Sequence, residues 1–225
     1  MKKLLFNALI CTTFAFNSQN VTTQTIEKSG FLEMGLSTLL LQPSDRDLMS
    51  FFGIGFSGGK YVTKYSYVGF EANLNFLISK QEEIGTFQYT AVYVNGSTTR
   101  TGTITKAYNV FPILGTWSLA LNLSEKVQFN VGPVLGTTLF HFYPQFNPSP
   151  NDERIHNKPE IPEKTKAAFS YGGEGGLLFR LWEGEMGDTY LGVRYKYLRN
   201  TGTTFDEDKF GGINHQIKLV LNLTW

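Results

Sequence analysis

The sequence lacks the features that mark several common classes of protein. It has one cysteine, Cys11, so no disulfide bond can form within the chain. Basic and acidic side chains number 20 and 19, which argues against a nucleic-acid-binding protein, since such proteins carry a basic excess. Charged residues make up 17% of the chain, below the roughly 25% of ordinary soluble domains. No apolar run reaches the about 20 residues that a membrane-spanning helix needs.

Glycine and aromatic residues are abundant instead. The 225 residues include 23 glycines, 19 phenylalanines, 11 tyrosines and 3 tryptophans. So much apolar surface excludes an intrinsically disordered chain. Few charges together with many aromatic residues and glycines are typical of a β-barrel that crosses a membrane.

The first 20 residues have the organisation of a secretory signal peptide. Lys2 and Lys3 begin it, residues 4–16 form an apolar stretch too short to span a membrane, and residues 17–20 are polar. We expect cleavage between about residues 17 and 24, which would remove Cys11. The prediction is export through the general secretory pathway, with residues 30–225 forming a single domain.

From Gly30 onward the dominant pattern is alternation of apolar and polar residues, the signal of β-strands. It is clearest at the end of the chain, where one face of the last strand holds Ile217, Leu219, Leu221, Leu223 and Trp225.

The alternation predicts eight strands. They lie at about 31–41, 49–58, 65–76, 108–123, 127–139, 167–181, 189–199 and 214–225. Strands of soluble proteins average about 5 to 6 residues, whereas a tilted strand needs about 9 to 11 to cross a membrane. The predicted fold is therefore all-β: an eight-stranded antiparallel up-and-down transmembrane β-barrel.

The two faces of these strands differ in a way that suits a membrane. One face is apolar and rich in aromatic residues, as lipid contact requires. The other is small or polar and carries charges that we expect to pair inside a narrow barrel. This predicted lumen network consists of Glu71, Glu174, Arg180, Arg194, Lys196 and Lys218. A soluble, lipocalin-like barrel with its apolar face turned inward is the alternative interpretation.

Outer-membrane barrels have short periplasmic turns and longer outer loops. The three longest predicted connections, at 79–107, 143–166 and 200–213, fall on one side, and those at 59–64, 124–126 and 182–188 fall on the other. The connection at 42–48 lies on the outer side as well but is no longer than that at 182–188. Asn95 and Gly96 indicate a hairpin within about 81–106. We interpret it as an extracellular extension, with two further barrel strands, ten in all, as the alternative.

Aromatic residues near the strand ends fit interfacial belts. The candidates for the outer belt are Tyr108, Phe142, Tyr143, Phe169 and Tyr197, and those for the periplasmic belt are Tyr61, Trp182 and Trp225.

Several short segments resemble a known family. They are Asn109 to Leu114 (NVFPIL), Val131 to Gly136 (VGPVLG), Tyr171 to Gly176 (YGGEGG), Val193 to Tyr195 (VRY) and the terminal strand ending on Trp225. Over about residues 30–225 the chain resembles the small outer-membrane β-barrels of the OmpX/OmpA type, and more closely the PorT-like group of Bacteroidetes-type bacteria. The resemblance implies an outer-membrane location and reading of the terminal strand by the barrel-assembly machinery. It implies that the assembly signal consists of Ile217, Leu219, Leu221, Leu223 and Trp225. It implies no single activity.

The sequence contains no pattern that indicates catalysis or cofactor binding. His141, His156 and His215 have no further ligand at a useful spacing, and no His lies two residues before a Ser, as a barrel acylhydrolase would need. The run Gly172 to Gly176 lacks the lysine of a phosphate-binding loop. The acidic segment 206–208 fits no calcium loop. We therefore predict no catalytic residue, no cofactor site and no metal site.

The sequence-based hypothesis is a non-enzymatic outer-membrane barrel with a side-chain-filled lumen. We expect it to act structurally or through its outer loops, in adhesion or as an accessory to secretion. The expected partners are outer-membrane lipid, the barrel-assembly machinery and an extracellular or secretion partner, with no nucleic acid. A small pore or ligand-transport barrel is the alternative, and a lipid-modifying barrel enzyme is a weaker one.

Overall fold

The computed structural model describes residues 29–42, 48–78, 83–93, 96–148, 155–156, 159–185, 187–201, 204–205, 208–209 and 212–225. The predicted signal segment at 1–20 and its cleavage site lie outside these residues. Within the described part, no helix is long and apolar enough to cross a membrane.

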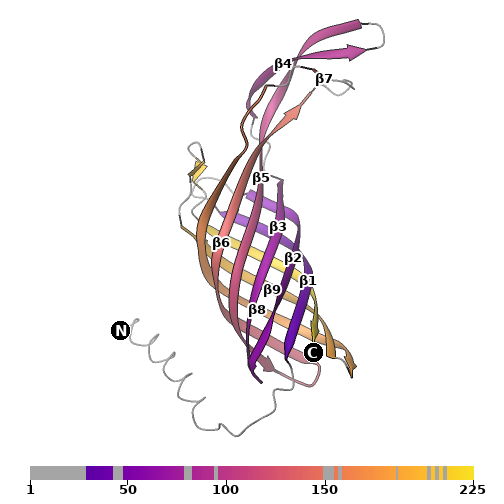
Figure 1. The fold of residues 1–225 in the computed structure, drawn as a ribbon, viewed down its shortest axis with the longest axis vertical. Coiled ribbons are helices and arrows are strands. Elements are labelled where there is room, and N and C mark those ends of the chain that lie inside the picture. Colours follow the sequence, from indigo (N-terminus) through magenta and orange to yellow (C-terminus); the bar gives the residue numbers. More distant parts are fainter. Residues whose placement is uncertain are drawn as a thin grey trace.

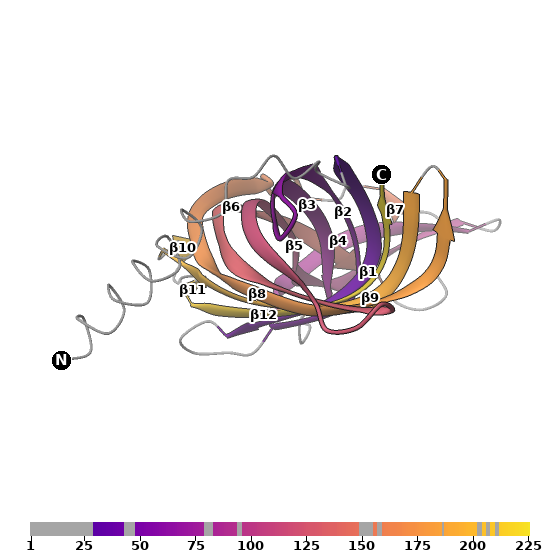
Figure 2. The same cartoon turned by 90° about the horizontal axis from the view of Figure 1, so that it is seen from below.

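Eight long antiparallel strands form a closed barrel (Figures 1 and 2). In the order of their hydrogen bonding they are β3 (Ser66–Ile78), β2 (Leu48–Thr63), β1 (Gly30–Gln42), β12 (Ile213–Thr224), β9 (Gly187–Asn200), β8 (Lys164–Gly184), β6 (Val127–Asn147) and β5 (Gly96–Asn122). Pairing of β3 with β5 closes the cylinder. The prediction of an eight-stranded antiparallel barrel is confirmed, and the ten-strand alternative is wrong, because the hairpin strand β4 (Glu83–Tyr93) pairs with β5 beyond the barrel wall.

Alternation along each strand separates an apolar outer face from a polar inner face. On β1, Leu32, Met34 and Leu36 are each about half exposed, whereas Glu33 and Ser37, at positions of the opposite face, are buried. On β12, the predicted assembly residues Ile217, Leu219, Leu221 and Leu223 likewise point outward, and so does Trp225 just beyond the strand. A register slip of one residue would turn every such side chain to the opposite face, so the barrel register follows from this pattern.

The barrel has a turn end and a loop end. At the turn end, β2–β3, β5–β6 and β8–β9 are joined by short turns, and the last of these is shorter than predicted because β8 and β9 extend to Gly184 and Gly187. Gly187 has φ +139°, a conformation that other residues rarely adopt. The end of the chain is held at this end by backbone hydrogen bonds between Trp225 and Gly30.

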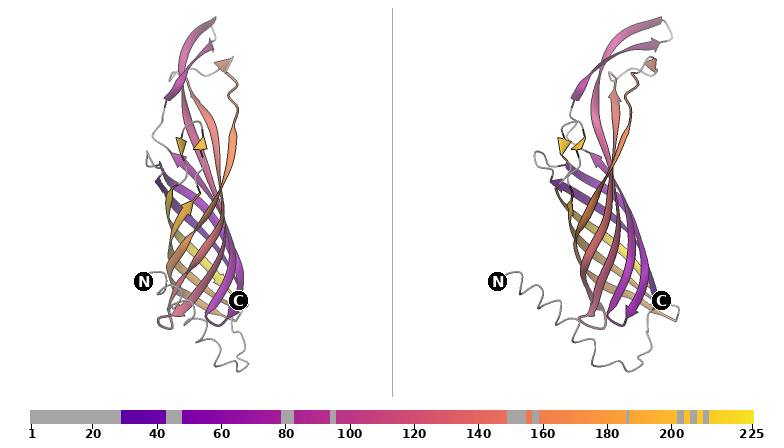
Figure 3. Two further views of the ribbon diagram at one scale, coloured as in Figure 1. Left: turned by 90° about the vertical axis from the view of Figure 1, so that its left-hand side faces the viewer. Right: turned by 60° about the vertical axis from the view of Figure 1, so that its left-hand side comes forward.

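At the loop end, β5 and β6 rise far above the other strands (Figure 3). They are 27 and 21 residues long, and the outer part of β5 pairs with β4 on one side and β6 on the other. The short strand β7 (Ile155–His156) pairs with β4. We call this extension the projection, defined as residues 83–93 and 96–105 with 144–147, 155–156 and 159–161. A second small hairpin, β10 (Thr204–Phe205) with β11 (Asp208–Lys209), lies in the connection after β9.

The aromatic belts differ in part from the prediction. Phe169, Tyr197, Trp182 and Trp225 are exposed on the outer surface, whereas Tyr108, Phe142 and Tyr61 are buried inside the barrel. The three buried residues occupy inward positions of their strands. Whether an aromatic side chain faces the membrane therefore depends on its place in the inward–outward alternation and not on its distance from the strand end.

Candidate functional site

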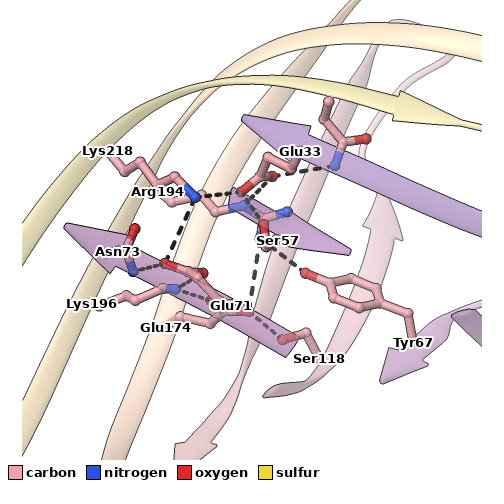
Figure 4. A network of polar contacts seen from close by, with 11 residues as sticks. Glu33, Ser57, Tyr67, Glu71, Asn73, Ser118, Glu174, Arg194, Lys196 and Lys218 are labelled. Atoms are coloured by element: carbon pink, nitrogen blue, oxygen red, sulfur yellow. Dashed lines mark hydrogen bonds and ion pairs between the residues drawn. The ribbon is translucent and has the colours of Figure 1, made fainter. Parts of the chain in front are cut away.

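A closed ring of six charged side chains crosses the lumen (Figure 4). Three carboxylates come from β1, β3 and β8, and three cations come from β9 and β12. They are Glu33, Glu71, Glu174, Arg194, Lys196 and Lys218, and each is at most 5% exposed. We call this set the lumen ring.

Acids and bases alternate around the lumen ring, so each charge has two opposite neighbours. Glu33 Oε2 lies 2.7 Å from Arg194 Nε, and Glu33 Oε1 lies 3.3 Å from Lys218 Nζ. Glu174 Oε1 lies 3.8 Å from Arg194 Nη1, and Glu174 Oε2 lies 3.3 Å from Lys196 Nζ.

Glu71 completes the circle. It pairs closely with Lys196 and at 3.7 Å with Lys218. The ring contains three negative and three positive groups, so its formal charge cancels. Cancellation matters because an unpaired buried charge is strongly destabilising.

Neutral side chains complete the hydrogen bonding of the carboxylates. Ser57 Oγ donates to Glu33 Oε1 at 3.1 Å, and Ser118 Oγ donates to Glu174 Oε1 at 2.6 Å. Asn73 Nδ2 donates to Glu71 Oε1 at 2.5 Å. Arg194 Nη1 donates to the Tyr67 hydroxyl at 2.9 Å. These bonds hold the ring in one arrangement, since each carboxylate has protein donors on more than one strand.

Five of the six residues predicted for the lumen network lie in this ring, and Arg180 does not. Arg180 lies at the turn end, where its Nη1 is 3.0 Å from Glu183 Oε2, and the Glu183 side chain is 70% exposed. The prediction for Arg180 is therefore corrected. Arg180 occupies an inward position of β8 in the alternation, but it lies too near the barrel mouth to reach the lumen ring.

Glu33 was missed from the sequence. It stands between the outward residues Leu32 and Met34, on a strand assigned from its apolar face alone. A signal was present, because a carboxylate at an inward position of a barrel strand needs a cationic partner.

Apolar and aromatic side chains fill the lumen on either side of the ring. Near the loop end, one cluster comprises Leu39, Tyr108, Val110, Phe140, Phe142 and Ala168. Near the turn end, Phe31, Tyr61, Tyr67 and Ala120 pack together. Just outside them is a polar pocket of about 560 Å³ at the barrel mouth, lined in part by Gln128, Arg180 and Asp188. Within the described residues, the lumen is thus occupied by side chains at three levels.

The projection has an apolar core of its own. Phe87, Tyr89, Ala91 and Ile104 are buried there, with Phe146 and Ile161 packed against them. The rings of Phe87 and Phe146 meet edge to face with centroids 5.3 Å apart. Such a core makes the projection an ordered sheet that continues the barrel wall.

The sequence predicts no catalytic, cofactor or metal site at the three histidines or at the glycine run of residues 172–176. His141 Nδ1 lies 2.9 Å from Thr165 Oγ1, and His215 Nδ1 lies 2.6 Å from the Tyr195 hydroxyl, both at the outer surface. His156 lies in β7. The glycine run is part of β8 and precedes no helix. A Cβ at Gly176 would lie 2.8 Å from the Val193 carbonyl oxygen, so close strand packing accounts for the glycine at this position. Among the described residues, no group of three or more His, Cys, Asp and Glu side chains is placed to hold a metal ion.

These features define a class of protein: a small β-barrel with an apolar exterior and an ion-paired, filled interior. Solved structures of small outer-membrane barrels are similar to it. Neisserial surface protein A matches with a TM-score of 0.57 and 8% identity, over 87% of this chain and 97% of that one. Ail of Yersinia pestis matches with a TM-score of 0.48 and 9% identity, over 88% and 99%. The β-barrel domain of Pseudomonas aeruginosa OprF matches with a TM-score of 0.38 and 8% identity, over 88% and 98%.

The likeness to Neisserial surface protein A shows a shared fold, that of a small β-barrel. No family model matches the sequence. No curated protein matches it either. The resemblance to the PorT-like group stays a prediction.

Proposed function

We propose that the protein is a non-enzymatic integral barrel of the bacterial outer membrane that acts through its loop end and not through a pore. Its signal segment would direct it through the general secretory pathway, and its terminal strand would be read by the barrel-assembly machinery. The turn end would face the periplasm, and the projection would stand on the cell surface.

The outer surface supports a membrane location. On β5, Phe111, Ile113, Trp117 and Leu121 lie on the outward face, and Trp117 and Leu121 are 49% and 41% exposed. Ten residue steps from Phe111 to Leu121 span about 33 Å of strand. At a tilt of about 40° this gives a band about 25 Å high, the height of the apolar band of outer-membrane barrels. A water-soluble barrel would have little reason to expose so many large apolar side chains.

The lumen ring is the observation that carries the proposal. It joins strands on opposite sides of the barrel, and apolar clusters fill the space on either side of it. An eight-stranded barrel has an interior just wide enough for side chains. A path for bulk solutes would require the ring and both clusters to move, so the exposed projection is the better candidate for contact with a partner. Adhesion and an accessory role in secretion both fit such a surface.

Two measurements test this proposal. Heat-modifiable gel mobility of the detergent-extracted outer-membrane fraction should show a compact unboiled form that shifts on boiling. Purified protein in a planar bilayer should then give no stable open-channel steps. A soluble protein without a shift would refute the membrane location, and regular ohmic steps would favour the pore alternative.

A further inference from the structure

The outward face of the projection carries an array of mostly uncharged polar side chains. We call it the threonine face. It comprises Thr86, Gln88, Thr90, Ser97, Thr99, Thr101, Thr103, Gln145 and Asn147. Thr105, just below it, is buried and hydrogen-bonded to Gln145 and Asn147. Cross-strand register places Thr86 beside Thr103, Gln88 beside Thr101 and Thr90 beside Thr99. The register also places Glu83 opposite Thr105 at the base of the sheet and His156 opposite Thr90, whereas Thr86, Gln88, Thr99, Thr101 and Thr103 have only uncharged polar partners across β4 and β5.

The threonine face is available to a ligand. Thr86, Gln88, Thr99 and Thr101 are exposed. The opposite face of the same strands holds the apolar core of the projection, where Phe87 and the other core side chains are buried. The sheet therefore needs no cover on its outward side for its own stability, and the hydroxyl groups remain open.

The threonine face continues the apolar band of the barrel. The register between β5 and β6 runs without a shift from Thr103 to Thr116, so outward residues of the projection and of the band share one surface. Phe111 is the last large apolar outward residue of β5. Asn109 follows it, then the buried Ala107 and Thr105, and then the more exposed threonines. A lipid chain lying against Phe111 would thus have its saccharide part beside Thr103 and the residues above it.

The chemistry of the array suits sugar hydroxyl groups. β-branched threonines hold few rotamers, so their hydroxyls are ordered before binding and lose little entropy. Along a strand they repeat every 6.6 Å or so, and across strands about every 4.8 Å. Amide groups of Gln88, Gln145 and Asn147 add donors and acceptors of both kinds.

We infer that the threonine face binds the saccharide part of the glycolipid that surrounds the barrel in the outer leaflet. This inference rests on the proposed membrane location. From Thr103 to Ser97 the face covers about 20 Å of strand, enough for several sugar units. Contact along this length would hold the projection upright in the carbohydrate layer.

The test compares two triple variants of Thr99, Thr101 and Thr103 in the full-length barrel. Valine at all three positions keeps the branched shape and removes the hydroxyls, whereas serine keeps the hydroxyls. Binding of core oligosaccharide, released by mild acid from rough lipopolysaccharide, is measured by titration, with dextran as the comparison sugar. We expect binding at least about tenfold weaker in the valine variant, because three hydrogen bonds are lost, and within about threefold of wild type in the serine variant.

The outcomes separate the possible occupants. Equal affinity of the wild type and the valine variant, no detectable binding by either, or equal binding of dextran would overturn the inference. A dimer of the wild type that the valine variant abolishes would assign the face to a second copy and overturn it too. Gel mobility is measured on every variant: an intact heat shift with no saccharide binding refutes the inference alone, whereas no shift in the wild type refutes the proposed function.

Discussion

Removing one carboxylate from the lumen ring should destabilise the barrel far more than its size suggests. Glu33→Leu breaks the contacts to Arg194 at 2.7 Å and Lys218 at 3.3 Å and leaves three buried cations facing two carboxylates. Breaking a buried ion pair from one side costs about 3–5 kcal/mol. We expect a loss of this size in the free energy of unfolding.

A second substitution makes this prediction specific to charge. Lys218→Met alone should cost a similar amount, because it leaves three carboxylates facing two cations. The double variant retains Arg194, Glu174, Lys196 and Glu71, which are still linked in sequence by ion pairs and sum to zero charge. Its cost should fall below the sum of the single costs by at least about 2 kcal/mol.

The assay is urea unfolding of the barrel in phospholipid vesicles, followed by tryptophan fluorescence and by the heat-modifiable gel shift. Arg180→Met is the matched control, since its partner Glu183 is largely exposed, and it should cost no more than about 1 kcal/mol. An unchanged unfolding midpoint for Glu33→Leu would refute the reasoning. Strict additivity in the double variant would show that the ring charges do not act together.

Three further predictions concern other parts of the molecule. Glu174→Leu should also reduce the free energy of unfolding, by about 3–5 kcal/mol, because Lys196 and Arg194 lose a shared partner. The urea midpoint should fall accordingly, and a midpoint equal to that of the wild type would contradict this prediction. Gly187→Ala should cost about 1–3 kcal/mol, because its φ of +139° strains any other residue; unfolding identical to wild type would show that the turn relaxes freely. Phe87→Ala should open the projection to limited proteolysis while the barrel keeps its heat shift, because the core around Phe87 is separate from the lumen; loss of the heat shift would mean that the two fold as one.

Much of the fold follows from local pattern. A strand in a two-sided environment must present one kind of residue to each side, so alternation on β12 and β9 is visible without any tertiary information. The same pattern identified Glu71, Glu174, Arg194, Lys196 and Lys218 as inward charges. Strand ends were less predictable, because β5 and β6 continue their alternation into the projection with threonines in place of apolar outward residues.

The sequence by itself determined the barrel, its inward and outward faces and most of its buried charges, because a period of two is a local property of the chain. Only the tertiary structure decided which charges meet. Glu33 and Arg194 are 161 residues apart on strands separated by β12, and Lys196 reaches Glu71 across the lumen. Such contacts depend on the closure of the cylinder and the stagger of its strands, which set the height of each side chain in the lumen. The same stagger leaves Arg180 at the mouth with Glu183 and brings Glu33 into the ring.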